Sequence, residues 1–222
     1  MLDFKSYLEE GINDPSIFKA IFLAGGPGSG KSFIVGKTAL QQMGFKLINS
    51  DIAFERALAK VGLNPSPEDI ASNKGQEVRA QSKELTDKKM QLAINGRLGL
   101  IIDGTGKDYE KIVGQVNQLR ALGYSVAMIF VNTDLETAMV RNNKRKRSLP
   151  DDMIKKMWDS VQRNIGKFQN LFRDRMIIID NSEGSNYEGA VMSAYRKISK
   201  WSASPIKNPI AKRWIDQQKK SR

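Results

Sequence analysis

The chain has 222 residues, of which 40% are hydrophobic and 27% charged, and its net charge is +12; this composition is typical of a single globular domain. It contains neither cysteine nor histidine, which excludes disulfides, thiolate or imidazole metal sites and a histidine general base, and favours magnesium with oxygen ligands. No stretch approaches the roughly 18 apolar residues of a membrane span, and residues 1–14 lack a signal-peptide core, so we expect a cytoplasmic protein without a membrane partner.

Short apolar runs alternate with helical segments along the chain. The runs are apolar at consecutive positions, as expected for strands buried on both faces of a parallel sheet. We predict strands over Phe18–Ala24, Phe45–Asn49, Leu98–Ile102, Ser125–Val131 and Met176–Ile179. We predict helices over Lys31–Met43, Ile52–Val61, Glu68–Asn95, Tyr109–Leu122, Leu135–Asn143, Met153–Leu171 and Asn186–Lys200, with Asp134 and Asp151 as N-caps. The alternation predicts a three-layer α/β domain over residues 1–200, with about five parallel strands and helices on both faces.

The first predicted strand leads into Gly25-Gly26-Pro27-Gly28-Ser29-Gly30-Lys31-Ser32, a complete match to the phosphate-loop (P-loop) pattern G-x-x-x-x-G-K-[ST]. Glycines let backbone amides turn toward phosphate oxygens, and a helix that begins near Lys31 directs its positive end at the same anion. We therefore predict that residues 25–33, Phe33 included, bind ATP, with Lys31 on the β- and γ-phosphates and Ser32 on Mg²⁺. The alternative is a glycine-rich turn without a ligand.

Two acidic residues follow predicted strands, at the end of a parallel sheet where ligands bind. Asp51 follows the second strand, where it could accept the proton of an acceptor hydroxyl; the alternative is a helix N-cap. Asp103 and Thr105 belong to Ile102-Asp103-Gly104-Thr105-Gly106 after the third strand. We predict that Asp103 holds a magnesium-bound water or the acceptor and that Thr105 contacts the acceptor. The alternative is an ordinary strand-to-helix turn.

A basic segment follows the fourth strand and its helix. The segment Arg141–Arg147 carries five positive charges in seven residues, which repel one another unless an anion neutralises them. We predict a lid over about residues 141–152 that closes on ATP, with Arg141, Arg145 and Arg147 stabilising the transferring phosphoryl group. The alternative is a solvated basic loop or a nucleic-acid patch. Neither an N-K-x-D motif nor a D-E run after an apolar strand is present, which disfavours GTPases and motor ATPases.

Together these motifs resemble the zeta-toxin-like and polynucleotide-kinase-like branch of P-loop kinases, over roughly residues 19–180. The resemblance implies a kinase-type P-loop NTPase fold, with Asp51 as the catalytic carboxylate and Lys31 serving ATP. In zeta toxins a glutamate usually takes the place of Asp103 and contacts the substrate. Polynucleotide kinases have an arginine shortly after the catalytic aspartate, and Arg56 matches it at a looser spacing.

Most of the excess charge lies near the carboxyl end. Residues 195–222 contain nine Lys or Arg against one acid, Asp216, which gives +8 of the total. We predict that residues 201–222 form a basic tail that binds nucleic-acid phosphates and stacks Trp201 and Trp214 on bases. The alternative is an amphipathic helix that packs Trp201, Ile206, Ile210 and Trp214 on the core.

Three functions follow from these features. The favoured one is an ATP-dependent kinase that phosphorylates a hydroxyl of DNA, RNA or a nucleotide. The second is a zeta-toxin-like kinase of a UDP-sugar such as UDP-N-acetylglucosamine, which would imply an inhibitor protein as a partner. The third is a non-enzymatic factor that binds nucleic acid in a nucleotide-dependent way.

Overall fold

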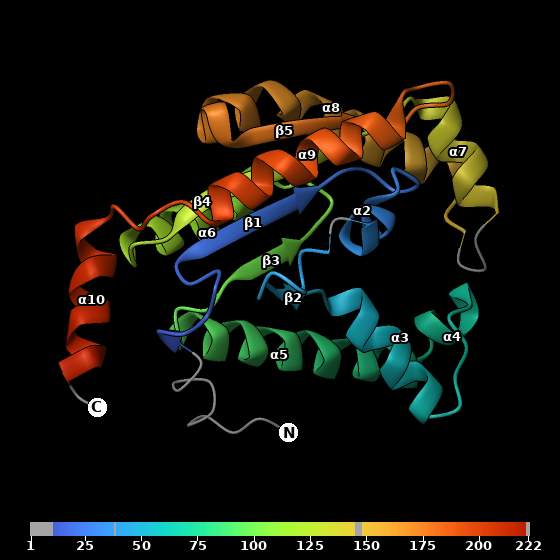
Figure 1. Cartoon of the computed structure of the whole chain (residues 1–222). Coiled ribbons are helices and arrows are strands. Elements are labelled where there is room, and N and C mark those ends of the chain that lie inside the picture. Colours follow the sequence, from blue (N-terminus) through green and yellow to red (C-terminus); the bar gives the residue numbers. More distant parts are fainter. Residues whose placement is uncertain (1–10, 38, 145–147, 221–222) are drawn as a thin grey trace.

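Five parallel strands form one sheet in the order β2-β3-β1-β4-β5. The computed structural model describes residues 11–37, 39–144 and 148–220. The strands are β1 (Lys19–Ala24), β2 (Lys46–Ile48), β3 (Leu100–Asp103), β4 (Ser125–Asn132) and β5 (Met176–Asp180). Figure 1 shows β1 in the middle of the sheet. This arrangement confirms the predicted α/β fold, and all five predicted strands are present.

Helices cover both faces of the sheet. They are α2 (Lys31–Lys37), α3 (Ser50–Lys60), α4 (Pro67–Ala71), α5 (Asn73–Asn95), α6 (Tyr109–Ala121), α7 (Leu135–Asn143), α8 (Asp151–Phe172), α9 (Tyr187–Ser202) and α10 (Pro209–Lys220), with a short 3₁₀ turn η1 (Arg173–Arg175). Within the described residues, none of these helices is both long enough and apolar enough to cross a membrane.

The central strand β1 divides the core into two layers. All six of its residues are buried, and successive side chains of a strand point to opposite faces. Phe22 packs in the layer that contains side chains of α5, α6 and α8, whereas Ile21 and Leu23 pack in the layer of α2 and α9. The continuous apolar sequence of the strand is therefore explained by burial on both sides.

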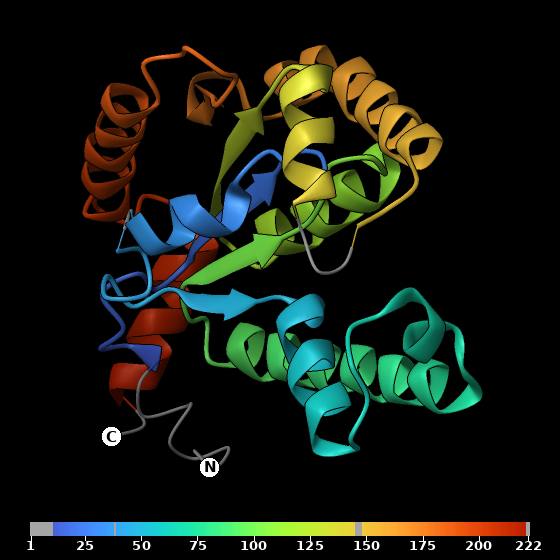
Figure 2. The same ribbon diagram turned by 90° about the vertical axis from the view of Figure 1, so that its right-hand side faces the viewer.

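A smaller apolar cluster joins α3 to α5. It contains Phe54 and Leu58 of α3 and Val78 of α5, all of them buried. Figure 2 shows α3, α4 and α5 grouped toward the β2 edge of the sheet, while α7 and α8 lie toward the opposite edge. The helix that follows β2 therefore packs on α5.

Several helix boundaries differ from the predicted ones. The helix after the P-loop ends at Lys37, well before Met43. The segment predicted as one helix over Glu68–Asn95 is broken at Ser72, whose ψ of 154° is extended and whose hydroxyl accepts a hydrogen bond from Gly75 N, so that it caps α5. Serine competes with helical hydrogen bonding in this way. Asp134 is the N-cap of α7 as predicted, but Pro150 takes the N-cap position of α8, and Asp151 is its first residue.

The predicted basic tail contains the helix α10, which packs on the core at the amino end of β1 (Figure 1). The ring of Trp214 meets the ring of Phe18 edge-on at 5.5 Å, and the Arg97 guanidinium lies 5.7 Å from the Trp214 ring. Ala211 is completely buried, whereas Ile210 is 51% exposed. The packing alternative is therefore confirmed for Trp214 and wrong for Ile210.

Trp201 is also held by the protein, at the end of α9. Its ring is stacked 6.5 Å from that of Phe45, and its indole N–H donates to Ser125 Oγ at 3.1 Å. Ile206 packs against the core as well. Because both indole rings of the tail make these contacts, base stacking by Trp201 and Trp214 would require them to leave the core.

We expect Trp214→Ala to lower the free energy of unfolding by about 2 to 4 kcal/mol, because it removes a large, partly buried ring and leaves a cavity. Urea denaturation measures this loss. Ile210→Ala, an exposed position of the same helix, is the matched control and should change stability by less than about 0.5 kcal/mol. Equal effects of the two substitutions would contradict the docked position of α10.

Candidate active site

The P-loop turns at the carboxyl end of β1 through glycines with positive φ, Gly28 and Gly30 among them. Gly28 has φ +76°, and a Cβ there would lie 2.6 Å from the carbonyl oxygen of Ala138. Gly30 has φ +90°, and a Cβ there would collide with the side-chain amide of Asn181. Only glycine fits these positions without strain. The loop thus follows the compact path that the sequence pattern predicts.

Lys31 folds back over the loop that precedes it. Its ammonium donates to the carbonyl oxygen of Gly25 at 2.5 Å and to that of Gly26 at 3.2 Å. The amide of Gly25 donates to the carbonyl oxygen of Thr105 at 3.1 Å. Ser32, next to Lys31, is exposed. A hydroxyl with access to solvent suits Mg²⁺, which usually keeps several water ligands.

Asn181 supports the P-loop from the end of β5, two strands away from β1 in the sheet, and the sequence analysis missed it. It follows β5, is 9% exposed, and donates from Nδ2 to the carbonyl oxygen of Ser29 at 2.8 Å. Arg141 reaches the same place, with 3.5 Å contacts to Gly28 O and Asn181 Oδ1. The position of Asn181 directly after a strand end was the available signal, because carboxyl ends of parallel strands meet at one edge.

Asp103 ends β3, the strand paired with β1, and therefore lies beside the start of the P-loop. Its register partner in β1 is Leu23, two residues before Gly25. Burial raises the pKa of the Asp103 carboxyl, and the charge of Asp51 raises it further, while Lys31 and a hydrogen bond from Asn49 act to lower it. The structure therefore brings Lys31, Asp51 and Asp103 within electrostatic reach of one another.

The side chain of Asn49 connects two of these acids. Its Nδ2 donates to Asp103 Oδ2 at 2.5 Å, and its Oδ1 accepts from the backbone amides of Asp51 and Ile52 at 2.8 and 3.1 Å. Asn49 is therefore the N-cap of α3, and the alternative interpretation of Asp51 as the cap is wrong. Asp51 occupies the first turn of α3 and is exposed, so its carboxylate is open to a ligand.

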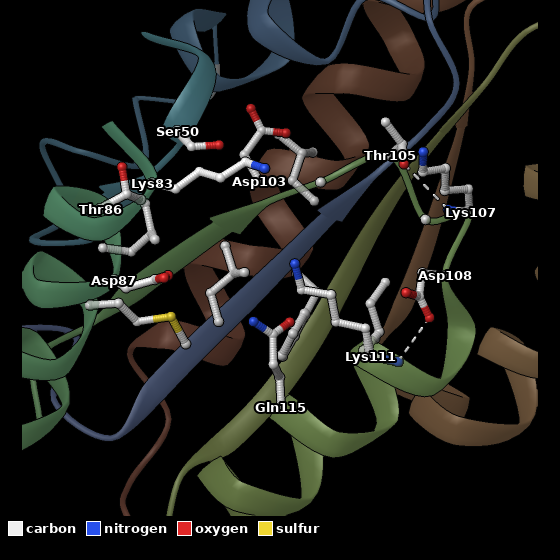
Figure 3. A pocket seen from close by; sticks show the side chains of 18 residues that line it. Ser50, Lys83, Thr86, Asp87, Asp103, Thr105, Lys107, Asp108, Lys111 and Gln115 are labelled. Carbon is white, nitrogen blue, oxygen red and sulfur yellow. Dashed lines mark hydrogen bonds between the residues drawn. The ribbon is translucent and has the colours of Figure 1, made fainter. Parts of the chain in front are cut away.

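A pocket of about 370 Å³ opens beside Asp103, between α5 and α6 (Figure 3). Its floor is apolar and includes Phe22 and Met90. Its polar lining comes from the start of α3, from α5, from the end of β3 and the loop after it, and from α6: Ser50, Lys83, Thr86, Asp87, Asp103, Thr105, Lys107, Asp108, Lys111 and Gln115. Three lysines face three aspartates in this set, which suits a polar ligand with both hydroxyl and anionic groups.

The other predicted site residues have different outcomes. Thr105 lines the pocket, but Arg56 does not: it is exposed on α3, where its charge acts on Lys89. Phe33 is 51% exposed, with its ring 5.7 Å from that of Tyr187. Arg145 and Arg147 lie outside the described residues.

Two buried oxygens of the site lack a hydrogen-bond partner among the described residues, Ser29 Oγ and Asp103 Oδ1. Buried polar atoms are normally paired, so orphaned ones mark places for an ion, a water or a ligand. Within the described part of the chain, no group of three or more acidic side chains could form a metal cage. A magnesium ion here would therefore depend on Ser32, Asp103, water and phosphate oxygens, a donor set that Mg²⁺ accepts.

We expect Asp103→Asn to stabilise the free protein at neutral pH, because it removes the cost of charging a buried carboxyl. Since the folded-state pKa of Asp103 is raised, the wild type loses this part of its stability as the pH rises through that pKa, and the variant does not. The difference in unfolding free energy should grow as the pH is raised above the ordinary aspartate pKa, in urea titrations without nucleotide or Mg²⁺. Asp87→Asn, an exposed residue of the same pocket, is the control with the same charge change. An Asp103→Asn variant less stable than wild type at neutral pH would contradict this account.

We expect Asn181→Ala to weaken nucleotide binding by roughly tenfold, because it leaves the Ser29 carbonyl unpaired and loosens the loop, at a cost of about 1 to 3 kcal/mol. Calorimetric titration with ATP measures the effect. Asn95→Ala, at an exposed end of α5, should leave the affinity unchanged. Wild-type affinity in Asn181→Ala would remove Asn181 from the binding site.

Comparison with known proteins agrees with this geometry. A family model described as "AAA domain" matches residues 21–166. No curated protein sequence was found to match the chain. Among solved structures, a chain of the AvrRxo1-ORF1:AvrRxo1-ORF2 complex with sulphate ions is similar at a TM-score of 0.59 and 16% identity, over 81% of this chain and 62% of that one. The chain thus spans less than two thirds of the length of that structure.

Two further structures cover both chains more evenly. One belongs to the PezAT chromosomal toxin-antitoxin system of Streptococcus pneumoniae, with a TM-score of 0.55 and 16% identity over 90% of this chain and 94% of that one. The other is shikimate kinase from Bacteroides thetaiotaomicron, with a TM-score of 0.50 and 14% identity over 81% and 98%. The family match, together with the P-loop and the strand order, shows that the chain belongs to the AAA domain family and has a P-loop kinase-like fold.

Proposed function

We propose that the protein is an ATP-dependent kinase that transfers the γ-phosphoryl group to a hydroxyl held in the pocket between α5 and α6. The observation that carries this proposal is the position of Asp103, which lies beside both the P-loop and the pocket. The P-loop approaches Asp103 from β1, and the pocket opens on its other side. A nucleotide and a second substrate would therefore lie next to each other, as in-line phosphoryl transfer requires.

Each residue of the site has a role in this reaction. Lys31 would bind the β- and γ-phosphate oxygens. To do so, its ammonium would leave the carbonyl oxygens of Gly25 and Gly26, to which it donates in the free protein. Mg²⁺, held by Ser32 and through water by Asp103, would supply neutralising positive charge to the phosphates. Arg141 would stabilise charge on the transferring group, and we propose the same for the lid arginines Arg145 and Arg147.

The proton of the acceptor hydroxyl would pass to Asp51. As it leaves, the acceptor oxygen forms a bond to the γ-phosphorus, and the bond between that phosphorus and the bridging oxygen of ADP breaks. Asp51 is suited to this role because it is an exposed carboxylate on the first turn of α3, close enough to Asp103 to raise the pKa of that acid. Asn49 fixes the position of this turn.

The pocket favours a small acceptor with hydroxyl and phosphate groups. A volume of about 370 Å³ accommodates a nucleoside or a sugar unit, and a nucleic acid could enter with its terminal nucleotide alone. Lys83, Lys107 and Lys111 would bind phosphate, while the aspartates would bind hydroxyls. A nucleotide and a sugar nucleotide such as a UDP-sugar both meet these requirements.

The structure of residues 201–220 supports nucleic-acid binding less than their basic composition does. This segment lies at the amino end of β1, away from the P-loop (Figure 1), and its tryptophans are packed against the protein. We therefore propose a nucleotide or sugar nucleotide as the acceptor ahead of polymeric DNA or RNA.

Incubation with γ-labelled ATP, Mg²⁺ and a panel of nucleosides, nucleotides, UDP-sugars and 5′-hydroxyl oligonucleotides tests the proposal. We expect label on a nucleotide or sugar nucleotide. Label on oligonucleotides alone would favour a polynucleotide kinase. Nucleotide binding with no labelled acceptor at high protein concentration would instead support a non-enzymatic, nucleotide-dependent binding factor.

We expect Asp51→Asn to reduce kcat by about 10² to 10⁴, since it removes the proton acceptor, and to leave ATP affinity within about twofold of wild type. Steady-state kinetics with the acceptor found above, together with ATP titration, separates these effects. Glu55→Gln changes the charge equally on an exposed position of the same helix and should retain activity. Comparable activity of Asp51→Asn and Glu55→Gln would rule out Asp51 as the base.

A further inference from the structure

A second pocket of about 320 Å³ lies at the opposite end of the sheet from the P-loop. It is formed where β1 and β4 begin, beside η1 and the loop between α9 and α10. Lys19 contributes from β1, Arg175 from η1 and Lys207 from the loop. Because these residues come from separate parts of the sequence, only the fold brings them together.

The lining of this pocket is positively charged. Lys19, Arg175 and Lys207 line it, and none of its lining residues is acidic. The pocket beside Asp103 differs, because its three lysines are matched by three aspartates. Among the described residues, the ion pairs within 4.0 Å lie elsewhere and involve none of these three cations.

Lys19 is an unusual cation because its residue is only 4% exposed. Its ammonium donates to the carbonyl oxygen and to the hydroxyl of Ser204 at 3.2 and 2.9 Å, and it lies 5.2 Å from the ring of Trp201. These partners are neutral. Burial lowers the pKa of Lys19, and the nearby charge of Arg175 lowers it further, so the ammonium sits in a positive electrostatic environment.

Further positive charge surrounds Arg175. Burial lowers the pKa of Arg120, and the charges of Arg175 and Arg173 add to that effect. Arg120 donates to the carbonyl oxygen of Leu171 at the end of α8, which again is a neutral partner. Clustered cations in a concave site raise the local concentration of anions.

We propose that this pocket binds a small molecule with a phosphate group, at a site separate from the nucleotide site. Lys19, Arg175 and Lys207 would bind the phosphate with charge-assisted hydrogen bonds, and Ser204 and Asn208 would add neutral ones. Apolar lining residues such as Phe18 and Ile206 would contact an apolar part of the ligand. The small volume fits a phosphate monoester of sugar size better than a polymer. The proposal does not depend on the function proposed above.

Proton–nitrogen NMR of the full chain, titrated with inorganic phosphate and then with a sugar phosphate at constant ionic strength, tests the proposal. The Trp201 indole N–H, which donates to Ser125 Oγ, reports on this pocket, and that of Trp158, which donates to Thr133 O after β4, reports on the nucleotide end. We expect the Trp201 signal to shift saturably with a Kd of about 1 mM or lower.

Two double variants with the same loss of charge decide whether the pocket itself binds. Arg175→Gln with Lys207→Gln should weaken binding at Trp201 by roughly tenfold or more. Lys219→Gln with Lys220→Gln, at the end of α10 and outside the pocket, should change it by less than about twofold.

Several outcomes would overturn the proposal. They are a linear, non-saturating shift, equal losses in the two variants, or phosphate shifting Trp158 alone. Tighter binding of a single-stranded oligonucleotide, lost equally in both variants, would show a general polyanion surface in place of a small-ligand pocket.

Discussion

The pairing of β1 between β3 and β4 is the constraint on which the site depends. The three strands are parallel and in register, so that Leu23 lies beside both Asp103 and Ile129. The P-loop therefore begins next to the carboxyl ends of its neighbours, where α/β sheets bind ligands. A shift of one residue in this register would turn Asp103 to the other face of the sheet. The apolar core thus determines the position of the polar site.

The electrostatics of the site follow from that placement. Asp103 is held in a mostly buried position, with one oxygen bonded to Asn49 and the other without a partner among the described residues. Burial raises the pKa of Asp103, which means that the charged form of this carboxyl destabilises the folded protein. Groups of this kind concentrate at functional sites. A bound metal, water or substrate would supply the interaction that the free protein lacks.

The sequence predicts those parts of the fold that depend on local pattern. The continuous apolar runs and the P-loop motif determine the strands, the fold class and the placement of Lys31 and Ser32. Local sequence patterns do not predict contacts between residues that are far apart in the chain. Nothing local to Asn181 shows that it binds the Ser29 carbonyl, and a basic composition does not show that Trp214 packs on Phe18. The second pocket could not be predicted from the sequence for the same reason, because Lys19, Arg175 and Lys207 are far apart in the chain.

The double role of Asn49 has a mechanical consequence. One amide group caps α3 through its oxygen and bonds Asp103 through its nitrogen, so the first turn of α3 is tethered to the end of β3. Any swing of α3 away from the end of β3 must break this tether or move the strand end with it. We therefore expect the first turn of α3, which carries Asp51, and the end of β3, which carries Asp103, to move together.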